Sequence, residues 1–555
     1  MDLEKTMNKF EQLKKAFFNH IQSLHSVDQS ALTHVSFELN TDLDKIQFGD
    51  ISTNIAMILA KQLKSNPRKI AESITQSFSH KHVEKAEIAG PGFINLFATD
   101  KFYTDLTEEL HAQKENFFKP EEKPTKNLNV EFVSANPTGP LHFGHGRNAI
   151  IGDVLARVLK FLEYPVTKEF YINDAGAQIT KLGKSLKVRC QQELGEVISL
   201  PEDAYQGEYL IETAQKCIAE HGKGILEESD RFFEEYGKKL MLEQLKTTLQ
   251  SFNINFDIWF SEKSLHGEQK IEEALAILEK NNYLYEADGA LWFKSTEFGD
   301  DKDRVLKKKD GSYTYVSGDI AYMLNKLNRG FDQLVMVLGH DHHSYEFRLK
   351  ALLQALGYKK EQLNIILYQL VHIKNKDGQS ARMSKRSGNI VTLHDIIESV
   401  GCDVARFFFL NRKADAELDF DLDLALKQSN ENPVYYIQYA YVRTHSLLQK
   451  AQSEHNVAPS NNTPKAFTKY EKLLIKKIVS FKELLSKIGN NHQIHLISYF
   501  TYEVANLFNT HYNSAKMIDA QNLEQTQERL FMVKITQQTI QMCLNLLGIS
   551  TPTKM

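Results

Sequence analysis

The chain has 555 residues, of which 42% are hydrophobic and 25% charged, a composition typical of a globular protein rather than a disordered or fibrous one. Its length exceeds what one hydrophobic core supports, so we expect roughly two to four domains. The 67 Lys and Arg residues are balanced by 71 Asp and Glu residues, which excludes a generally basic nucleic-acid coat but leaves room for a local basic face.

Cysteine usage and the start of the chain indicate the compartment. The four cysteines stand far apart and form no CxxC pair, so neither a zinc site nor a disulfide framework is predicted, and a reducing compartment is favoured. The N-terminus has no apolar signal stretch, and no apolar run is long enough for a membrane span. We therefore expect a soluble cytoplasmic protein without membrane contact.

The chain divides into segments of different character. Residues 1–115 predict a small α/β domain, in which a Gly-Pro-Gly turn at 90–92 separates two short strands. Residues 116–126 carry two prolines and many charges, which is typical of an exposed linker. The next segment, 127–422, alternates short β-rich runs with longer helical patterns, the signature of a parallel sheet with helices.

Helical patterns dominate two further regions. The pattern of residues 191–285 is mainly helical and highly charged, and we expect them to form an insertion attached to the sheet rather than part of it. Residues 423–555 carry long helical periodicities and predict an all-helical domain. The expected fold class is α/β: a Rossmann-like, doubly wound parallel sheet between a small N-terminal α/β domain and an all-α C-terminal domain.

An HxGH motif lies at a strand-to-helix junction. His142 and His145 follow a predicted buried strand at 129–133 and precede a helix whose apolar stripe runs over 151–162. Such a junction presents free N–H groups and the positive end of a helix dipole, so it favours phosphate. Two imidazoles can donate hydrogen bonds to phosphate oxygens, and Gly144 lets a nucleotide approach the backbone. The alternative is a pair of structural histidines.

A short basic loop at 382–389 contains Met-Ser-Lys, with Lys385 as its third member, and a capping box at Thr392 and Asp395 opens the next helix. Lys385 is suited to stabilise the charge that builds as pyrophosphate leaves, although such a charge run alone is usually a solvated loop. The distance in sequence from His145 suits two halves of a doubly wound sheet, whose carboxyl edge would join the two loops. Together they predict a nucleotide-activating site.

The HxGH motif in the first part of the chain and the MSK motif in the later part resemble the signature pair of class I aminoacyl-tRNA synthetases. Further sequence segments resemble those of arginyl-tRNA synthetases of bacterial type. The matching segments are 90–95, 134–141, 171–176, 317–322, 341–343 and 432–436. Departures are small: Ser317-Gly318 and Ser344 differ from the family pattern, and Arg382 replaces the first lysine of KMSKR but keeps its charge.

The resemblance implies a ligase that joins L-arginine to tRNA(Arg) through an arginyl-adenylate, using ATP with Mg²⁺, without a structural metal and as a monomer. Family members typically need bound tRNA before they activate the amino acid. The implied catalytic residues are His142, His145 and Lys385. The implied ATP-binding residues are Ala135, Pro137, Thr138, Gly139, Pro140, Leu141, Phe143, Gly144, Met383, Ser384 and Arg386. The implied arginine-binding residues are Glu131, Asn136, Tyr315, Asp319 and His342, and the implied tRNA-binding residues are Tyr435, Tyr436, Tyr439 and Arg443.

Physical chemistry supports part of this assignment and leaves alternatives. A planar, permanently charged guanidinium is best held by carboxylates, which Glu131 and Asp319 would supply. These two residues and Tyr315 could instead have purely structural roles. Glu131 could point out of its strand, Asp319 could cap a helix, and Tyr315 could be a packed aromatic. The tyrosines suit RNA bases but also suit helix packing.

Three other functions remain open from the sequence. They are a small-molecule nucleotidyltransferase, a non-catalytic RNA-binding relative of the synthetase fold, and a class I synthetase for another amino acid. The large helical domain argues against the first, and the intact motifs argue against the second.

Overall fold

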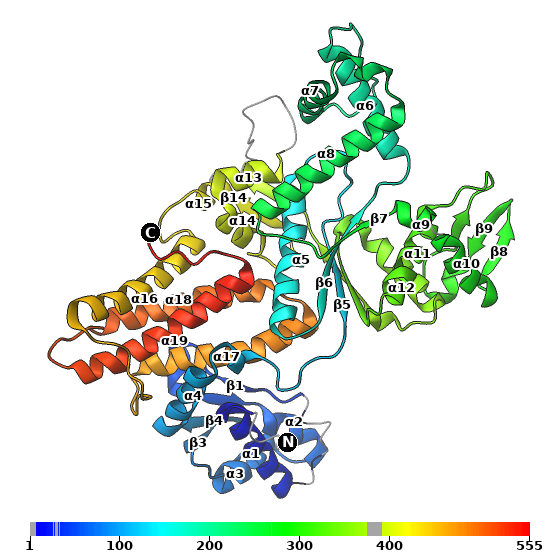
Figure 1. Cartoon of the computed structure of the whole chain (residues 1–555). Coiled ribbons are helices and arrows are strands. Elements are labelled where there is room, and N and C mark those ends of the chain that lie inside the picture. Colours follow the sequence, from blue (N-terminus) through cyan, green and yellow to red (C-terminus); the bar gives the residue numbers. More distant parts are fainter. Residues whose placement is uncertain (1–6, 26, 28–31, 33, 268, 375–390) are drawn as a thin grey trace.

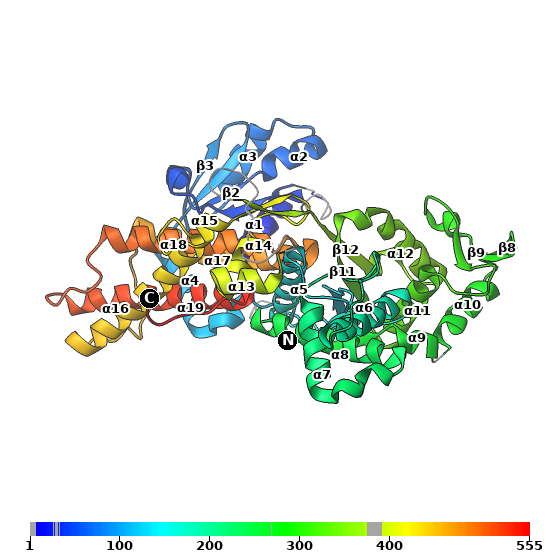
Figure 2. The ribbon, with the colours of Figure 1, turned by 90° about the horizontal axis from the view of Figure 1, so that it is seen from above.

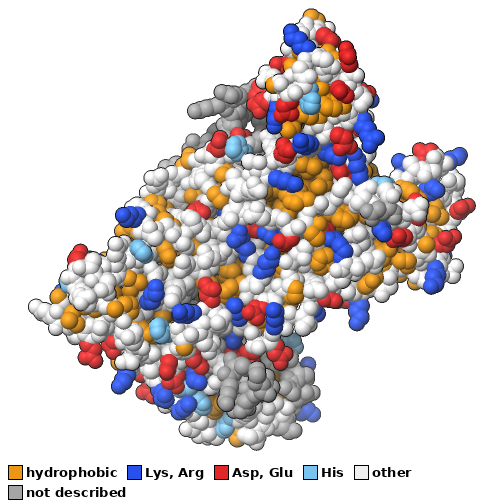
Figure 3. All heavy atoms as spheres, viewed as in Figure 1, with side chains coloured by type: hydrophobic (Ala, Val, Ile, Leu, Met, Phe, Trp, Pro, Cys, Tyr) orange, Lys and Arg blue, Asp and Glu red, His pale blue; other side chains and the backbone are white. Residues whose placement is uncertain are grey.

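The structure is a computed structural model, and it describes residues 7–25, 27, 32, 34–267, 269–374 and 391–555. A central sheet domain carries two lobes on one side, and the N-terminal domain lies beneath a bundle of long helices on the other (Figures 1 and 2). Basic and acidic side chains are interspersed over the face drawn in Figure 3, in keeping with the small net charge. Within the described ranges, no helix has the length and apolarity needed to cross a membrane.

The N-terminal domain is a four-stranded antiparallel sheet covered by helices, with strand order β1-β2-β4-β3. Its elements are α1 (Lys9–Leu24), β1 (Phe37–Leu39), β2 (Ile51–Thr53), α2 (Ile55–Leu63), α3 (Pro67–Ser77), β3 (Val83–Ala89), β4 (Phe93–Ala98) and α4 (Asp100–Gln113). The expected turn joins β3 to β4, and Gly90 and Gly92 both take positive φ there, which glycine adopts without strain. The α/β prediction for this segment is confirmed.

The central sheet has five parallel strands in the order β12-β11-β5-β6-β7. The strands are β5 (Leu128–Glu131), β6 (Val166–Ile172), β7 (Ile258–Ser261), β11 (Gln333–Gly339) and β12 (Leu363–Tyr368), and the main helices around them are α5 (Phe143–Phe161), α11 (Tyr315–Asn328) and α12 (His343–Ala355). The chain builds from β5 outward to β7 and then returns to the other side of β5. The strand order therefore reverses between β5 and β11, the place where open α/β sheets bind ligands at the strands' carboxyl ends.

The prediction of one helical insertion over about 191–285 is wrong, because β7 lies inside that range and pairs with β6 in the central sheet. Two separate lobes flank this strand. Before β7 stands a helical unit of α6 (Ala177–Glu193), α7 (Tyr209–His221) and α8 (Asp230–Ser251). After β7 comes a small lobe of α9 (Lys263–Gly267), α10 (Lys270–Lys280), β8 (Leu284–Ala287), β9 (Ala290–Phe293) and β10 (Arg304–Lys307). The four-residue strand was hidden because a 22-residue helix precedes it.

The C-terminal part is helical, with long helices α16 (Pro433–His455), α17 (Lys469–Asn491), α18 (His495–Ser514) and α19 (Leu523–Leu547). A connecting region joins it to the sheet domain and contains β13 (Val371–Lys374), α13 (Leu393–Val400), α14 (Cys402–Phe409), β14 (Leu418–Asp421) and α15 (Leu422–Ala425). Helix α19 packs on α5, the helix that carries the first motif, so the helical domain touches the central domain directly.

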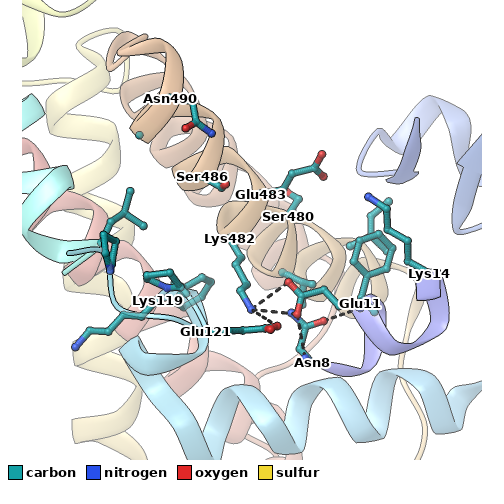
Figure 4. A pocket seen from close by; sticks show the side chains of 18 of the residues that line it. Asn8, Glu11, Lys14, Lys119, Glu121, Ser480, Lys482, Glu483, Ser486 and Asn490 are labelled. Atoms are coloured by element: carbon teal, nitrogen blue, oxygen red, sulfur yellow. Dashed lines mark hydrogen bonds and ion pairs between the residues drawn. The ribbon is translucent and has the colours of Figure 1, made fainter. Parts of the chain in front are cut away.

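The N-terminal domain also contacts this bundle, chiefly through α17. Lys476 of α17 is almost fully buried and lies 2.9 Å from the carboxylate of Asp50. Nearby, Lys482 lies 3.0 Å from Glu11 and 4.0 Å from Glu121 at a cavity of about 390 Å³ (Figure 4). Burial, with the Glu11 carboxylate close by, raises the pKa of Glu121. The expected linker, 116–126, thus takes part in an interface, and two residues near its start, Phe117 and Phe118, are buried rather than exposed.

Candidate active site

A cavity of about 830 Å³ opens at the carboxyl edge of the sheet, at the reversal between β5 and β11. Six residues expected from the sequence line it together: Glu131, Ala135, Asn136, His142, His145 and Asp319. These residues come from three separate elements, the end of β5, the start of α5 and the first turns of α11. The first motif and two residues of the arginine pocket implied by the resemblance, Glu131 and Asp319, therefore face one cavity.

The backbone that leaves β5 is held in an uncommon conformation. Val133 and Ser134 both have positive φ, at 66° and 42°, which is rare for a β-branched residue and typical of functional sites. Asn148, one turn after His145 on α5, accepts a hydrogen bond from the Val133 N–H at 2.6 Å and donates to the Val337 carbonyl at 2.9 Å. Asn148 thus holds the loop, a role that only its helical spacing from the motif could have suggested.

The two histidines stack at the start of α5, with ring centroids 3.6 Å apart. The His142 backbone N–H donates to His145 Nδ1 at 3.2 Å, so the neutral His145 ring carries its proton on Nε2. Burial, together with the neighbouring His142, lowers the pKa of His145 to about 3, and burial also lowers the pKa of His142. Both rings are therefore uncharged donors at neutral pH. A Cβ on Gly144 would lie 3.0 Å from His142 Cε1, so this glycine leaves room for the ring.

Two carboxylates present free oxygens inside the domain. Within the described chain, Asp319 Oδ2 and Glu262 Oε2 are buried without a hydrogen-bond partner. Burial raises the pKa of Asp319 to about 6, and burial with Asp174 and Asp319 nearby raises that of Glu262 to about 7. A buried carboxylate oxygen without a hydrogen-bond donor is costly, which makes this a candidate site for a cationic ligand. Glu262, directly after β7, was missed because its strand was read as part of a helical insertion.

Asp319 does not cap its helix, so that alternative is wrong: Thr314 is the N-cap of α11, and Asp319 lies inside the helix. Its Oδ1 accepts a hydrogen bond from the Tyr345 hydroxyl. Glu131 does not point out of its strand into solvent either, since it is buried and lines the cavity. Its Oε2 lies 2.5 Å from the buried Lys326 Nζ, and Ser134 donates to Oε1 at 3.1 Å. The charge of Glu131 is therefore already paired.

Other expected site residues have different surroundings. Tyr315, the first residue of α11, is 74% exposed, so it is not a packed aromatic, and it is not among the residues that line the cavity. The loop between β5 and α5 has buried and partly exposed residues. The buried ones are Pro137, Leu141 and Phe143, the first residue of α5, and the partly exposed ones are Thr138, Gly139 and Pro140. The side chain of His342 lies outside the described part of the chain, as do Met383, Ser384, Lys385 and Arg386.

Comparison with known proteins identifies the family. Three family models match in order: the N-terminal domain of arginyl-tRNA synthetases over 11–98, the class I (R) tRNA synthetase catalytic domain over 106–415, and the DALR anticodon-binding domain over 437–555. An arginine–tRNA ligase of Bacillus subtilis is 44% identical over 561 residues, covering 99% of this chain and all of the relative. The chain belongs to the arginyl-tRNA synthetase family.

Solved structures agree with this arginyl-tRNA synthetase fold. A Campylobacter jejuni structure named as an arginyl-tRNA synthetase has a TM-score of 0.76 at 32% identity, covering 82% of this chain and all of that one. The Thermus thermophilus arginyl-tRNA synthetase has a TM-score of 0.75 and covers 99% of this chain, and at 20% identity it supports the fold alone. The resemblance read from the motifs and the expected fold class are both confirmed.

The tyrosines of the synthetase's α16 pack among themselves and against α18. Tyr435 and Tyr439 stack with centroids 6.3 Å apart, and Tyr436 lies 5.2 Å from Tyr502. The Arg443 guanidinium sits 4.7 Å from the Tyr439 ring. All four expected RNA contacts are partly exposed, so packing and RNA binding are compatible. No group of three or more His, Cys, Asp or Glu suited to hold a metal occurs in the described ranges.

Proposed function

We propose that this chain activates L-arginine with ATP and transfers it to tRNA(Arg) in the cavity at the carboxyl edge of β5 and β11. Family membership gives the overall reaction, the ATP-dependent joining of arginine to tRNA in protein synthesis. The observation that carries the site assignment is the buried, unpartnered Oδ2 of Asp319, which lines the same cavity as the neutral histidine pair. Glu262, whose Oε2 is also buried and unpartnered, lies close enough to Asp319 to interact with it but does not itself line the cavity.

In this proposal the arginine side chain enters the acidic end of the cavity. Asp319 and Glu262 take the guanidinium, whose forked donors match two carboxylates. Glu131 is already neutralised by Lys326 and is better suited to the amino-acid head group, together with Asn136. Tyr315 and His342 stay predictions for the same pocket. Bound in this way, arginine presents its carboxylate toward the start of α5.

ATP is proposed to lie across the N-terminus of α5. His142 and His145 donate hydrogen bonds to the phosphates as neutral groups, and the positive end of the helix adds to the attraction. Arginine's carboxylate attacks the α-phosphorus and pyrophosphate leaves. A terminal ribose hydroxyl of tRNA then attacks the carbonyl of the arginyl-adenylate, loses its proton and forms the ester, while the bond to the phosphate breaks and AMP leaves. Lys385 is proposed to stabilise the departing charge. Mg²⁺ would accompany the ATP phosphates rather than occupy a protein cluster.

The helical domain is proposed to bind tRNA(Arg) through Tyr435, Tyr436, Tyr439 and Arg443 on α16. Family members typically need tRNA for the activation step, so we expect the same requirement here. A monomer acting in the cytoplasm is the state that the resemblance favours.

The deciding experiment is arginine-dependent exchange between ATP and pyrophosphate, run with and without total tRNA, with lysine, glutamine and citrulline as alternatives. Exchange that needs arginine and tRNA supports the whole proposal, whereas exchange without tRNA keeps the ligase and removes the tRNA requirement. Folded protein that gives no exchange under any condition overturns it in favour of a non-catalytic relative. Exchange with another amino acid would overturn the role of Asp319 and Glu262.

A further inference from the structure

The helical unit formed by α6, α7 and α8 has no role in the proposal so far. It projects from the sheet domain as a lobe of its own (Figure 1). Its core is separate from the main one and is built from Leu182, Leu186, Cys190, Leu210, Ala214, Cys217, Ile225, Phe233 and Met241. A lobe with its own core can act as a rigid body, so its contacts with the active site are informative.

The first contact reaches the loop between β5 and α5. The hydroxyl of Tyr209, the first residue of α7, donates a hydrogen bond to the Thr138 carbonyl at 2.6 Å. A Cβ on the next residue, Gly139, would lie 3.1 Å from that hydroxyl, so the tyrosine sits close against the loop backbone. Burial raises the pKa of Tyr209 to about 12, which keeps the hydroxyl protonated and able to donate.

The second contact reaches the loop after β6. Asp174 is buried, and Lys238 of α8 lies 3.6 Å from its carboxylate. Ser261 and the Lys263 backbone N–H donate to the same carboxylate. Asn173, the residue before Asp174, lines the active-site cavity. The lobe therefore touches two neighbouring loops of the same site from two different helices.

The C-terminal end of α8 is anchored to the rest of the molecule (Figure 1). The Phe252 carbonyl, directly after α8, accepts a hydrogen bond from Arg406 at 2.7 Å, and the Asn253 side chain donates to the Gly548 carbonyl at 3.0 Å. Helix α8 is thus fixed at its C-terminal end to the connecting region and to the end of the helical domain. Helix α8 is therefore held at this end and packs along α6.

We propose that the α6–α8 lobe positions the nucleotide loop of the active site, and that Tyr209 is its positioning residue. Tyr209 touches the loop backbone and no reacting atom, so its effect reaches ATP through Thr138 and Gly139. The inference rests on the proposed binding of ATP at the start of α5. It predicts that loss of one hydroxyl, 71 residues away in sequence from Thr138, weakens the use of ATP without weakening the use of arginine.

The test compares Tyr209→Phe with Tyr236→Phe in the full chain, by exchange between ATP and pyrophosphate with tRNA present. Tyr236 is the matched control, because its hydroxyl bonds Glu220 within the same lobe and does not touch the loop. For Tyr209→Phe we expect kcat/KM for ATP to fall about fivefold or more, since the Thr138 carbonyl loses its donor. The KM for arginine and the thermal midpoint should match the wild type, and Tyr236→Phe should behave like the wild type throughout.

A third variant, His145→Ala, separates the two proposals. If His145→Ala loses exchange while Tyr209→Phe keeps wild-type kcat/KM for ATP, the positioning role is overturned and the ATP site stands. If neither variant changes exchange, the ATP site itself is overturned, and the inference with it. An equal fall in the ATP and arginine parameters of Tyr209→Phe, together with a lower thermal midpoint, would show a purely structural tyrosine and also overturn the positioning role.

Discussion

The guanidinium of Arg406 lies 2.6 Å from the carboxylate of Asp153, and both side chains are fully buried. Arg406 also donates to the carbonyls of Leu547 and Phe252 at 2.8 and 2.7 Å. Gly548 is required beside it, since a Cβ there would lie 2.2 Å from Nη2. One side chain thus joins the helix of the first motif, the end of α8, the connecting region and the last helix of the chain.

Replacing Arg406 should be among the most damaging single changes in the chain. In Arg406→Met the buried Asp153 loses its fully desolvated partner, so we expect the free energy of unfolding to fall by about 3 to 5 kcal/mol. Urea unfolding followed by tryptophan fluorescence measures this, because Trp259 lies in the adjoining sheet. The control is Arg157→Met, which removes a partly exposed partner of the same carboxylate and should cost about 1 kcal/mol. An equal loss of unfolding free energy in Arg406→Met and Arg157→Met would contradict the importance of the burial of Arg406.

Substitutions in the carboxylate pair test the arginine pocket. Asp319→Asn and Glu262→Gln each remove a charged acceptor for the guanidinium, so we expect kcat/KM for arginine to fall by roughly 2 kcal/mol, about 30-fold. The preference for arginine over its uncharged analogue citrulline should shrink by a similar factor, while the KM for ATP stays unchanged. Steady-state exchange assays measure all three. An unchanged KM for arginine in both variants would refute the assignment.

The carboxylates of Asp319 and Glu262 also predict that the KM for arginine depends on pH. Their pKa values are raised, to about 6 for Asp319 and about 7 for Glu262, so both take up protons as the pH falls through this range. The guanidinium stays charged and needs the ionised carboxylates, so the KM for arginine should rise as the pH drops from about 8 to about 6. In the wild type the KM for arginine should respond to two titrations, one near pH 6 and one near pH 7. At saturating ATP the Asp319→Asn variant should keep only the titration near pH 7. A KM that stays level over this range would count against the pair.

Gly144 allows a test of the histidine pair without removing either ring. In Gly144→Ala the new methyl group would meet the His142 imidazole at 3.0 to 3.1 Å, so the ring must shift from its place in the stack by a few tenths of an ångström. Gly144 lies within α5, where alanine is favourable, so the thermal midpoint should not fall. We expect kcat for exchange to drop about tenfold, since phosphate donors must be well placed. If Gly144→Ala keeps the wild-type kcat although the His142 ring has shifted, the stacking of His142 on His145 is not needed for the reaction.

Local patterns allowed the strand and helix around the first motif and the helical C-terminal domain to be predicted, because hydrophobic periodicity depends on few residues. The place of Asp319 in the pocket came from the resemblance to the family, and the predicted meeting of the His145 and Lys385 loops stays a prediction, because Lys385 lies outside the described residues. The charge balance of the pocket was not predictable. Lys326 neutralises Glu131 from 195 residues away, and Glu262 comes close to Asp319 only because a four-residue strand, β7, joins the sheet. Such pairings depend on tertiary structure, which the sequence alone does not reveal.

The surface of α16 offers the last test. Tyr435 is partly exposed and stacks only on Tyr439, whereas the Arg443 guanidinium is held by Asn509 at 2.6 Å and lies between the rings of Tyr439 and Tyr512. If this surface binds tRNA, Tyr435→Ala should raise the KM for tRNA(Arg) in charging roughly 5- to 150-fold, which corresponds to the value of one stacked base, about 1 to 3 kcal/mol.

The matched control for this variant is Tyr470→Ala on α17, a tyrosine of similar exposure on another helix. Because stacking involves no phosphate contact, the salt dependence of tRNA binding should be the same in Tyr435→Ala as in the wild type. The kcat at saturating tRNA should also be retained, since the change lies outside the active-site cavity. Equal KM values for the two variants would assign Tyr435 to helix packing alone, and the RNA surface would then have to lie elsewhere on the helical domain.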